Sequence, residues 1–287
     1  MKPQIKAFFD KDTFTVTYVV WDDKTMDGVV IDSVLDYDPV GSKIDVRSYN
    51  EVKNFLNDQK VNLKMVLETH AHADHISAAP LFKKDFGDIP IAIGEKITMV
   101  QDTFKSVFNL EKSFKVDGSQ FDILLKDEEI INAGSLEIKT LHTPGHTPAC
   151  ASYLIGDAVF TGDAMFMPDF GTGRCDFPKG DADALYDSIT KKLFTLPDET
   201  RVFVGHDYLP GGREVKWETT IKEEKENNIQ LNASSEKADF VEKRRARDAK
   251  LKAPKLIYQS IQANIDAGQL PVAEENGKKY FKVPISE

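Results

Sequence analysis

Short runs of β-branched and apolar residues recur along the first two thirds of the chain and predict strands. They fall at residues 13–20, 29–32, 64–68, 89–93, 151–155, 158–161 and 201–204. Apolar residues at helical spacing predict helices at 48–59, 95–108 and 181–196, with Ser48 and Asp181 as expected caps, and a further helix beginning at Ile76. The stretch 123–138 contains Asn132-Ala133-Gly134 and predicts a hairpin. Strands separated by helices are typical of an α/β sandwich.

The last quarter of the chain differs, because its patterns are helical at 214–227, 235–250 and 255–267. Ile257, Ile261 and Ile265 form an apolar stripe that we expect to pack on the preceding body. The sequence therefore predicts an α/β domain over residues 1–213 and a helical C-terminal extension over residues 214–287 that packs on it.

Composition and charge limit the partners. The chain has 287 residues, enough to bury a large core, and 41% of them are hydrophobic. A net charge of −10 argues against nucleic acid or an anionic membrane surface, which attract clustered positive charge. No apolar run reaches transmembrane length, and the N-terminus lacks the apolar core of a signal peptide. Only Cys150 and Cys175 are present, which suits a reducing compartment. We expect a cytoplasmic protein. Whether it forms a homodimer stays open.

The stretch Thr69-His70-Ala71-His72-Ala73-Asp74-His75 carries three imidazoles and one carboxylate directly after a predicted buried strand. Imidazole and carboxylate groups are ligands for zinc, iron and related divalent metals. Ligand-type residues also follow later strands, and all of these strand ends are expected at one edge of the sheets. The later candidates are His146, Asp163 and His206.

Asp32, at the end of an earlier strand, is either a turn former or a partner of a metal-bound histidine. A structural zinc site prefers a closed shell with cysteines, whereas this chain offers more ligands than one shell needs. The sequence therefore favours a catalytic metal site with open positions.

The order His-x-His-x-Asp-His, Gly-His, Gly-Asp, Gly-His over residues 13–208 resembles the metallo-β-lactamase superfamily. The resemblance implies an αββα sandwich with the metal site at one edge, between the two sheets. In the hydrolases of the superfamily, the matching residues hold two metals whose bridging hydroxide attacks an ester, thioester or amide carbonyl. One metal would take His70, His72 and His146, the other would take Asp74, His75 and His206, and Asp163 would bridge them.

A narrower resemblance points to the persulfide dioxygenases, and to a bacterial branch with a long helical C-terminus. It rests on the stretches 161–164, 173–177, 184–186, 206–208, 211–214 and 217–220. The resemblance implies one Fe(II) held by His70, His146 and Asp163, while His72, Asp74, His75 and His206 line or buttress the site. It also implies that glutathione persulfide and O2 are converted to sulfite and glutathione, a step of hydrogen sulfide detoxification.

Two alternatives stay open. One is a glutathione thioester hydrolase of the glyoxalase II type with two zinc or iron ions, because spacing alone supplies ligands for two metals. The other is a metal-binding or sulfur-sensing protein without catalysis, which the complete ligand set disfavours.

Glutathione carries two carboxylates, which need cationic partners. Arg174, in a glycine-rich loop, is the first candidate, and Tyr208 offers a hydroxyl near the substrate. The alternative is that Arg174 pairs with Asp169 or Asp176.

Three other features have no assigned function. The basic cluster Lys243, Arg244, Arg245 and Arg247 is interpreted as a solvated helix face in preference to an anion-binding site. His142 is interpreted as structural and Cys175 as a small hydrophobic residue rather than a reactive thiol.

Overall fold

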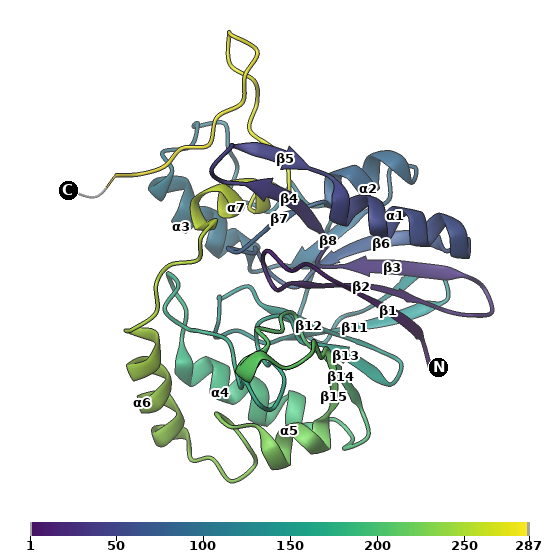
Figure 1. Ribbon diagram of the computed structural model, residues 1–287, viewed down its shortest axis with the longest axis vertical. Coiled ribbons are helices and arrows are strands. Elements are labelled where there is room, and N and C mark those ends of the chain that lie inside the picture. Colours follow the sequence, from purple (N-terminus) through teal and green to yellow (C-terminus); the bar gives the residue numbers. More distant parts are fainter. Residues whose placement is uncertain (1, 286–287) are drawn as a thin grey trace.

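A computed structural model describes residues 2–285 and contains two six-stranded sheets packed face to face (Figure 1). Helices cover both outer faces. In the view of Figure 1, α1 (Arg47–Gln59), α2 (Ala79–Asp85) and α3 (Ile97–Val107) lie above the sheets, and α4 (Ala182–Lys191) and α5 (Ile221–Asn227) lie below them. These four layers confirm the predicted αββα sandwich.

The first sheet has the strand order β1-β2-β3-β6-β8-β9. Its pairs β3–β6, β6–β8 and β8–β9 are parallel, and strands of this kind carry continuous apolar runs because helices and the second sheet cover both faces. The neighbours Met65, Val66 and Leu67 of β6 are accordingly all buried. The bounds are β1 (Gln4–Phe9), β2 (Val16–Trp21), β3 (Asp27–Ile31), β6 (Asn62–Glu68), β8 (Ile91–Gly94) and β9 (Ile123–Leu125).

The second sheet has the order β10-β11-β12-β13-β14-β15, and only its pair β13–β14 is parallel. It packs on the first sheet through aromatic rings: the ring of Tyr18 lies 5.2 Å from that of Phe160 and 5.5 Å from that of Phe203. The bounds are β10 (Ile130–Ala133), β11 (Leu136–His142), β12 (Ala151–Ile155), β13 (Ala158–Phe160), β14 (Arg201–Phe203) and β15 (Glu218–Thr220).

A small third sheet, in the order β5-β4-β7, lies beside the first and joins β4 (Val34–Asp38), β5 (Lys43–Asp45) and β7 (Ile76–Ser77). Short 3-10 turns occur at Leu193–Thr195 and Pro210–Gly212.

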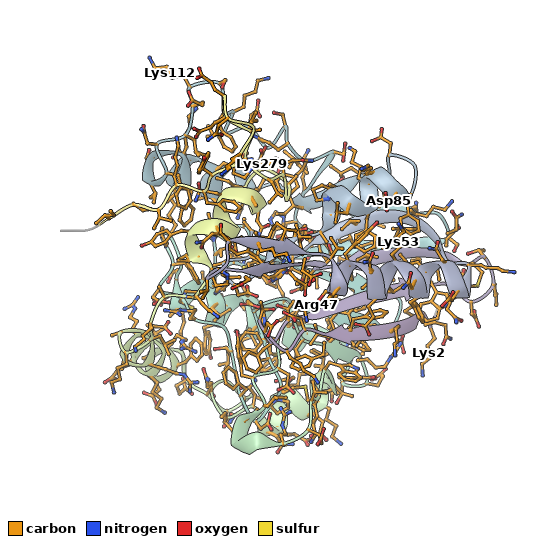
Figure 2. The ribbon with its side chains drawn as sticks, turned by 45° about the horizontal axis from the view of Figure 1, so that its top comes forward. Lys2, Arg47, Lys53, Asp85, Lys112 and Lys279 are labelled. Carbon is orange, nitrogen blue, oxygen red and sulfur yellow. The ribbon has the colours of Figure 1, made fainter. Side chains whose placement is uncertain are left out.

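Polar contacts link α1 and α2 on the surface. Lys53 of α1 and Asp85 of α2 are both labelled in Figure 2, and Lys53 Nζ lies 2.6 Å from Asp85 Oδ2. The Tyr49 hydroxyl donates to the same carboxylate. Because such partly exposed pairs contribute little, the helix is held mainly by its buried Val52 and Leu56.

Two predicted helix starts were wrong. Ile76 begins the strand β7, and α2 starts only at Ala79. Ser48 lies inside α1 and is not its cap. Instead, the carboxylate of Asp36, on β4, accepts hydrogen bonds from the Ser48 amide at 2.9 Å and from its hydroxyl at 2.8 Å. The amides at this helix end are therefore capped by a residue from another element.

Two further predictions were wrong in their bounds, because part of each segment pairs with a strand of one of the large sheets. The expected hairpin at 123–138 is split: β9 pairs with β8 in the first sheet, and the hairpin joins β10 to β11 around Gly134. The expected helix at 214–227 begins with β15, which pairs with β14 before α5 starts at Ile221.

The C-terminal part contains the expected helices α6 (Lys237–Asp248) and α7 (Ile257–Asn264), but residues 265–285 form neither helix nor strand, so the extension is helical only in part. In Figure 1, α6 lies beside α4, α7 lies on the opposite half, and residues 249–256 connect them across one edge of the sandwich. Ile261 and Ile265 are buried, as the apolar stripe predicted. The domain boundary at residue 213 stays a prediction. Within residues 2–285, no helix combines the length and apolar character needed to cross a bilayer.

One buried acid in α5 makes stability depend on pH. Burial, with help from the charges of Asp169 and Glu223, raises the pKa of Glu224 from 4.5 to about 8, although a hydrogen bond from Asn228 opposes the shift. The native state therefore holds a proton that the unfolded chain loses above about pH 4.5. The associated stability is complete below that pH and is lost as pH rises through about 8.

We expect the stability of Glu224→Gln relative to the native protein to be greater at pH 8.5 than at pH 5, as judged by the denaturant concentration at which each protein unfolds. The difference between the two pH values should be on the order of 3–5 kcal/mol. Urea titrations at both pH values measure it. The exposed Glu226→Gln is the matched control from the same helix, and an equal response of both variants would contradict the assignment.

Candidate metal centre

The candidate ligands lie where strands of both sheets end. The loop 69–75 follows β6, His146 follows β11, Asp163 follows β13, and His206 follows β14. All of them except Asp74 are buried. The fold thus places side chains that are far apart in sequence at one edge of the sandwich.

His70, His146 and Asp163 form one group, in which one possible ligand atom of each residue lies within 4.8 Å of the others. Two of the buried atoms, His70 Nε2 and Asp163 Oδ1, form no hydrogen bond of good geometry among residues 2–285, although His206 Nε2 lies 3.2 Å from Asp163 Oδ1. A buried polar atom without a partner costs roughly 1–3 kcal/mol, and a bound cation would satisfy both. Two neutral imidazoles and a carboxylate fit a divalent metal ion.

Hydrogen bonds behind the two rings determine which nitrogen faces the site. His146 Nδ1 lies 2.7 Å from the main-chain oxygen of Arg174, which can only accept, so Nδ1 carries the proton. The Thr69 hydroxyl donates its proton to Asp32 and therefore accepts from His70 Nδ1 at 3.0 Å. With its proton on Nδ1, each ring would offer the lone pair of Nε2 to a bound metal.

His72, Asp74 and His75 form a second group of possible ligands. Asp74 Oδ2 accepts a hydrogen bond from Nδ1 of the adjacent His75 at 2.9 Å. His206 Nε2 lies 3.6 Å from Asp74 Oδ2 and 3.2 Å from Asp163 Oδ1, so His206 stands between the two groups.

Asp32, Glu68 and His72 form a third, fully buried group. His72 Nε2 lies 3.0 Å from Asp32 Oδ1 and 3.2 Å from Glu68 Oε2. Asp32 has a positive φ of 51° as well, so it both makes the turn and supports a site histidine. Glu68 was not recognised from the sequence, although a carboxylate at the end of an apolar strand was a signal for it.

Burial and nearby charges set the protonation of the first group. Burial and the neighbouring His72 ring lower the pKa of His70 well below its usual value, which keeps the imidazole neutral. Burial opposes the charge of Asp163, but the imidazoles of His206 and His146 lower its pKa below the usual value. Burial likewise opposes a proton on His206, yet Asp163 raises the pKa of His206 to about 9.

Asn264, at the end of α7, holds the histidine loop in place. Its Nδ2 donates to the main-chain oxygens of His72 and His75, both at 2.8 Å, and its Oδ1 accepts from the Ser77 amide at 2.9 Å. No local pattern indicates this role, because Asn264 simply lies next to the apolar stripe of α7.

Two glycines allow backbone segments to meet at the site. A Cβ atom at Gly173 would overlap the main-chain oxygen of Asp163. Gly162 has a positive φ of 49°, and a Cβ there would lie 2.5 Å from Thr69 Oγ1. These close approaches bring the loops after β13 and β6 together.

A cleft of about 340 Å³ leads from the surface to the first group. His146 and Asp163 line its inner part, and Asp74 also borders it. Its walls are largely apolar and come from Phe166, Phe170, Phe177 and Leu251. The volume and lining are those of a small-molecule site.

Arg174 lines this cleft, but its guanidinium is occupied. Nε and Nη2 each donate to Asp176 at 2.6 Å, and Nη1 donates to the main-chain oxygen of Lys252 at 2.8 Å. This is the pairing with Asp176 that the sequence left open as an alternative.

The remaining candidates are placed as follows. Tyr208 borders the cleft, is 37% exposed, and stacks on His206 with ring centroids 5.5 Å apart. His142 is buried and bonds the main-chain oxygen of Leu125 at 2.9 Å, as a structural residue does. Burial raises the pKa of Cys175, so its thiol is protonated and behaves as a small apolar group.

A family model described as the metallo-beta-lactamase superfamily matches residues 10–206. The chain belongs to this superfamily. All the candidate ligands lie in the matched region, whereas Asn264 and the C-terminal part of the cleft lie outside it.

Comparison with individual proteins gives two different names. The chain is 43% identical over 286 residues to glyoxylase B2 of Dictyostelium discoideum, covering 99% of this chain and 98% of that protein. It is 29% identical over 272 residues to the human mitochondrial persulfide dioxygenase ETHE1, covering 94% and 91%. The solved structure of ETHE1 from Myxococcus xanthus is 31% identical, has a TM-score of 0.73, and is matched over 93% of this chain and 100% of that one.

Proposed function

We propose that the protein is a persulfide dioxygenase that converts glutathione persulfide, O2 and water to glutathione and sulfite. The observation that carries the proposal is the group His70, His146 and Asp163, two imidazoles and one carboxylate at the inner end of a largely apolar cleft. This set of ligands is typical of non-haem Fe(II) oxygenases. Similarity to proteins named ETHE1, one of them named a persulfide dioxygenase, supports it.

His70, His146 and Asp163 would hold one Fe(II) ion. When bound, the iron supplies a centre at which a sulfur substrate and dioxygen are brought together. The Arg174 carbonyl and the Thr69 hydroxyl orient the two imidazoles for this purpose.

The residues around this group shape the substrate path. Phe166, Phe170 and Phe177 form apolar walls that exclude water from the approach to Asp163. Tyr208, at the side of the cleft, places an aromatic hydroxyl within reach of a bound substrate.

An oxygen electrode tests the proposed reaction. We expect iron-loaded protein to consume one O2 per glutathione persulfide and to release one sulfite. Absence of oxygen uptake, together with hydrolysis of S-lactoylglutathione, would reject the dioxygenase.

The second candidate is a glutathione thioester hydrolase with two metals. It is favoured by the second group, His72, Asp74 and His75, and by the similarity to a protein named glyoxylase B2. Metal analysis of protein purified from its own host separates the candidates: one iron per chain favours the dioxygenase, and two metals favour the hydrolase. The cytoplasmic location stays a prediction.

A further inference from the structure

We propose that Arg247 and Lys255, carried by the C-terminal extension to the rim of the cleft, bind a carboxylate of the thiol that bears the persulfide. This inference rests on the proposed function, because it concerns the substrate of the same site. Both residues lie outside the region that the family model matches.

Residues 249–256 cross one edge of the sandwich between α6 and α7 (Figure 1), and members of this connection line the same cleft as His146 and Asp163. Leu251, Pro254 and Lys255 of this connection line the cleft together with Arg247, near the end of α6. The rim is therefore built by a segment that follows the metal-binding domain in the chain.

The end of α6 is anchored to the loop of the cleft. Arg244 and Asp248 form a buried ion pair one helical turn apart. Asp248 Oδ2 also accepts from the Cys175 amide at 2.8 Å, and Arg244 Nη1 donates to the main-chain oxygen of Thr172 at 3.2 Å. The backbone that carries Arg247 is thus already held in place, so binding a ligand does not cost the entropy of ordering this segment.

Four cations line the cleft, and two of them are already saturated. Arg174 is held by Asp176 and a main-chain oxygen, as described above. Arg244 is buried, and its contacts with Asp248 are completed by Gln230 Oε1 at 2.7 Å. All three nitrogens of each guanidinium thus already donate hydrogen bonds within the protein.

The other two cations are unpaired. Arg247 and Lys255 are exposed, and neither has a side-chain hydrogen bond or ion pair among residues 2–285. The Arg247 guanidinium lies 5.6 Å from the ring centroid of Phe170, which also lines the cleft. An aromatic ring positions the guanidinium plane while its N–H groups stay free to donate.

The charges along the cleft indicate what it binds. Its inner part presents the carboxylates of Asp74 and Asp163, and the whole chain is acidic. These carboxylates repel an anionic substrate. Positive charge at the rim offsets the repulsion and steers the substrate into the cleft. Apolar walls separate the two ends, so the fitting ligand has a sulfur end for the inner group and a carboxylate end for the rim.

Binding measurements on the iron-loaded protein test the assignment without turnover. The probes are S-methylglutathione and its diethyl ester, in which both carboxylates are blocked. We expect the native protein to prefer the free acid about tenfold, the effect of one charge-assisted contact. Arg247→Gln and Lys255→Gln should each reduce this preference, and the double variant should abolish it. Arg245→Gln is the matched control, because Arg245 is exposed on the same helix, pairs with Asp183 and does not line the cleft.

A double variant that retains the preference, or a native protein that binds both probes equally, overturns the inference. One outcome is a native protein that shows no oxygen uptake and yet prefers the free acid, with this preference lost in the double variant. That result supports the carboxylate site and rejects the dioxygenase. If oxygen is consumed with an unchanged KM for glutathione persulfide in the double variant, the dioxygenase stands and the carboxylate site falls.

Discussion

Asp163→Ala is expected to remove iron from the protein and to reduce oxygen uptake to the background rate. Asp163 is the only carboxylate of the first group, and it is buried beside the imidazoles that would share the metal. Loss of this charge leaves only two imidazoles as ligands, which bind Fe(II) too weakly to retain it. His70→Ala and His146→Ala should behave in the same way. Iron per chain, measured by mass spectrometry on folded protein, is the readout.

His72→Ala is the informative comparison, because His72 has the same residue type and the same burial as His70. Its Nε2 is engaged by Asp32 and Glu68, which places it behind the metal group in the proposed function. Removing such a supporting group typically lowers metal affinity ~10–100-fold, so at saturating iron the variant should retain most of its metal. Metal loss equal to that of Asp163→Ala would instead support the two-metal hydrolase.

Asn264→Ala is expected to lower the free energy of unfolding by roughly 3–5 kcal/mol and the melting temperature by roughly 5–15 °C. The change leaves two buried main-chain oxygens and one buried amide without their partner. Since those groups belong to the loop of His72 and His75, iron retention should fall as well. Calorimetry and metal analysis on the same samples measure both effects.

Two variants separate the hydrogen bonds of Asn264 from its shape. Asn264→Asp keeps the shape but turns a carboxylate oxygen toward two main-chain oxygens, so it should be at least as destabilising as alanine. Asn227→Ala is the matched control, because its side chain is exposed and bonds only Glu223. An Asn264→Asp variant as stable as the native protein would contradict the role assigned to Asn264.

Local patterns in the sequence were sufficient to predict the sandwich and to assemble the ligand candidates. A buried parallel strand needs a continuous apolar run, as in 64–68, whatever its neighbours are. Ligand-type residues that each follow such a run are brought to one edge by the common direction of the strands. The candidates His70, His146 and Asp163 do lie close together, although up to 93 positions separate them; their role as the ligands of one metal stays a prediction that the family resemblance implied.

Tertiary structure alone decided the features that depend on contacts between distant segments. The edge of β14 recruited β15 from a segment with a helical pattern, and Asp36 capped a helix in another part of the chain. Asn264 reaches a main-chain oxygen 192 residues away, and no periodicity encodes such a contact.

The same reason explains the cations of the cleft. From the sequence, both Arg174 and the cluster around Arg247 offered positive charge for an anion, and the loop glycines favoured Arg174. The fold pairs Arg174 with Asp176 and leaves Arg247 free over Phe170. The sequence by itself determined which residue types are available for a metal and an anion. The packing of the C-terminal extension determined which of the cations is saturated, because an ion pair depends on distances that only the folded chain fixes.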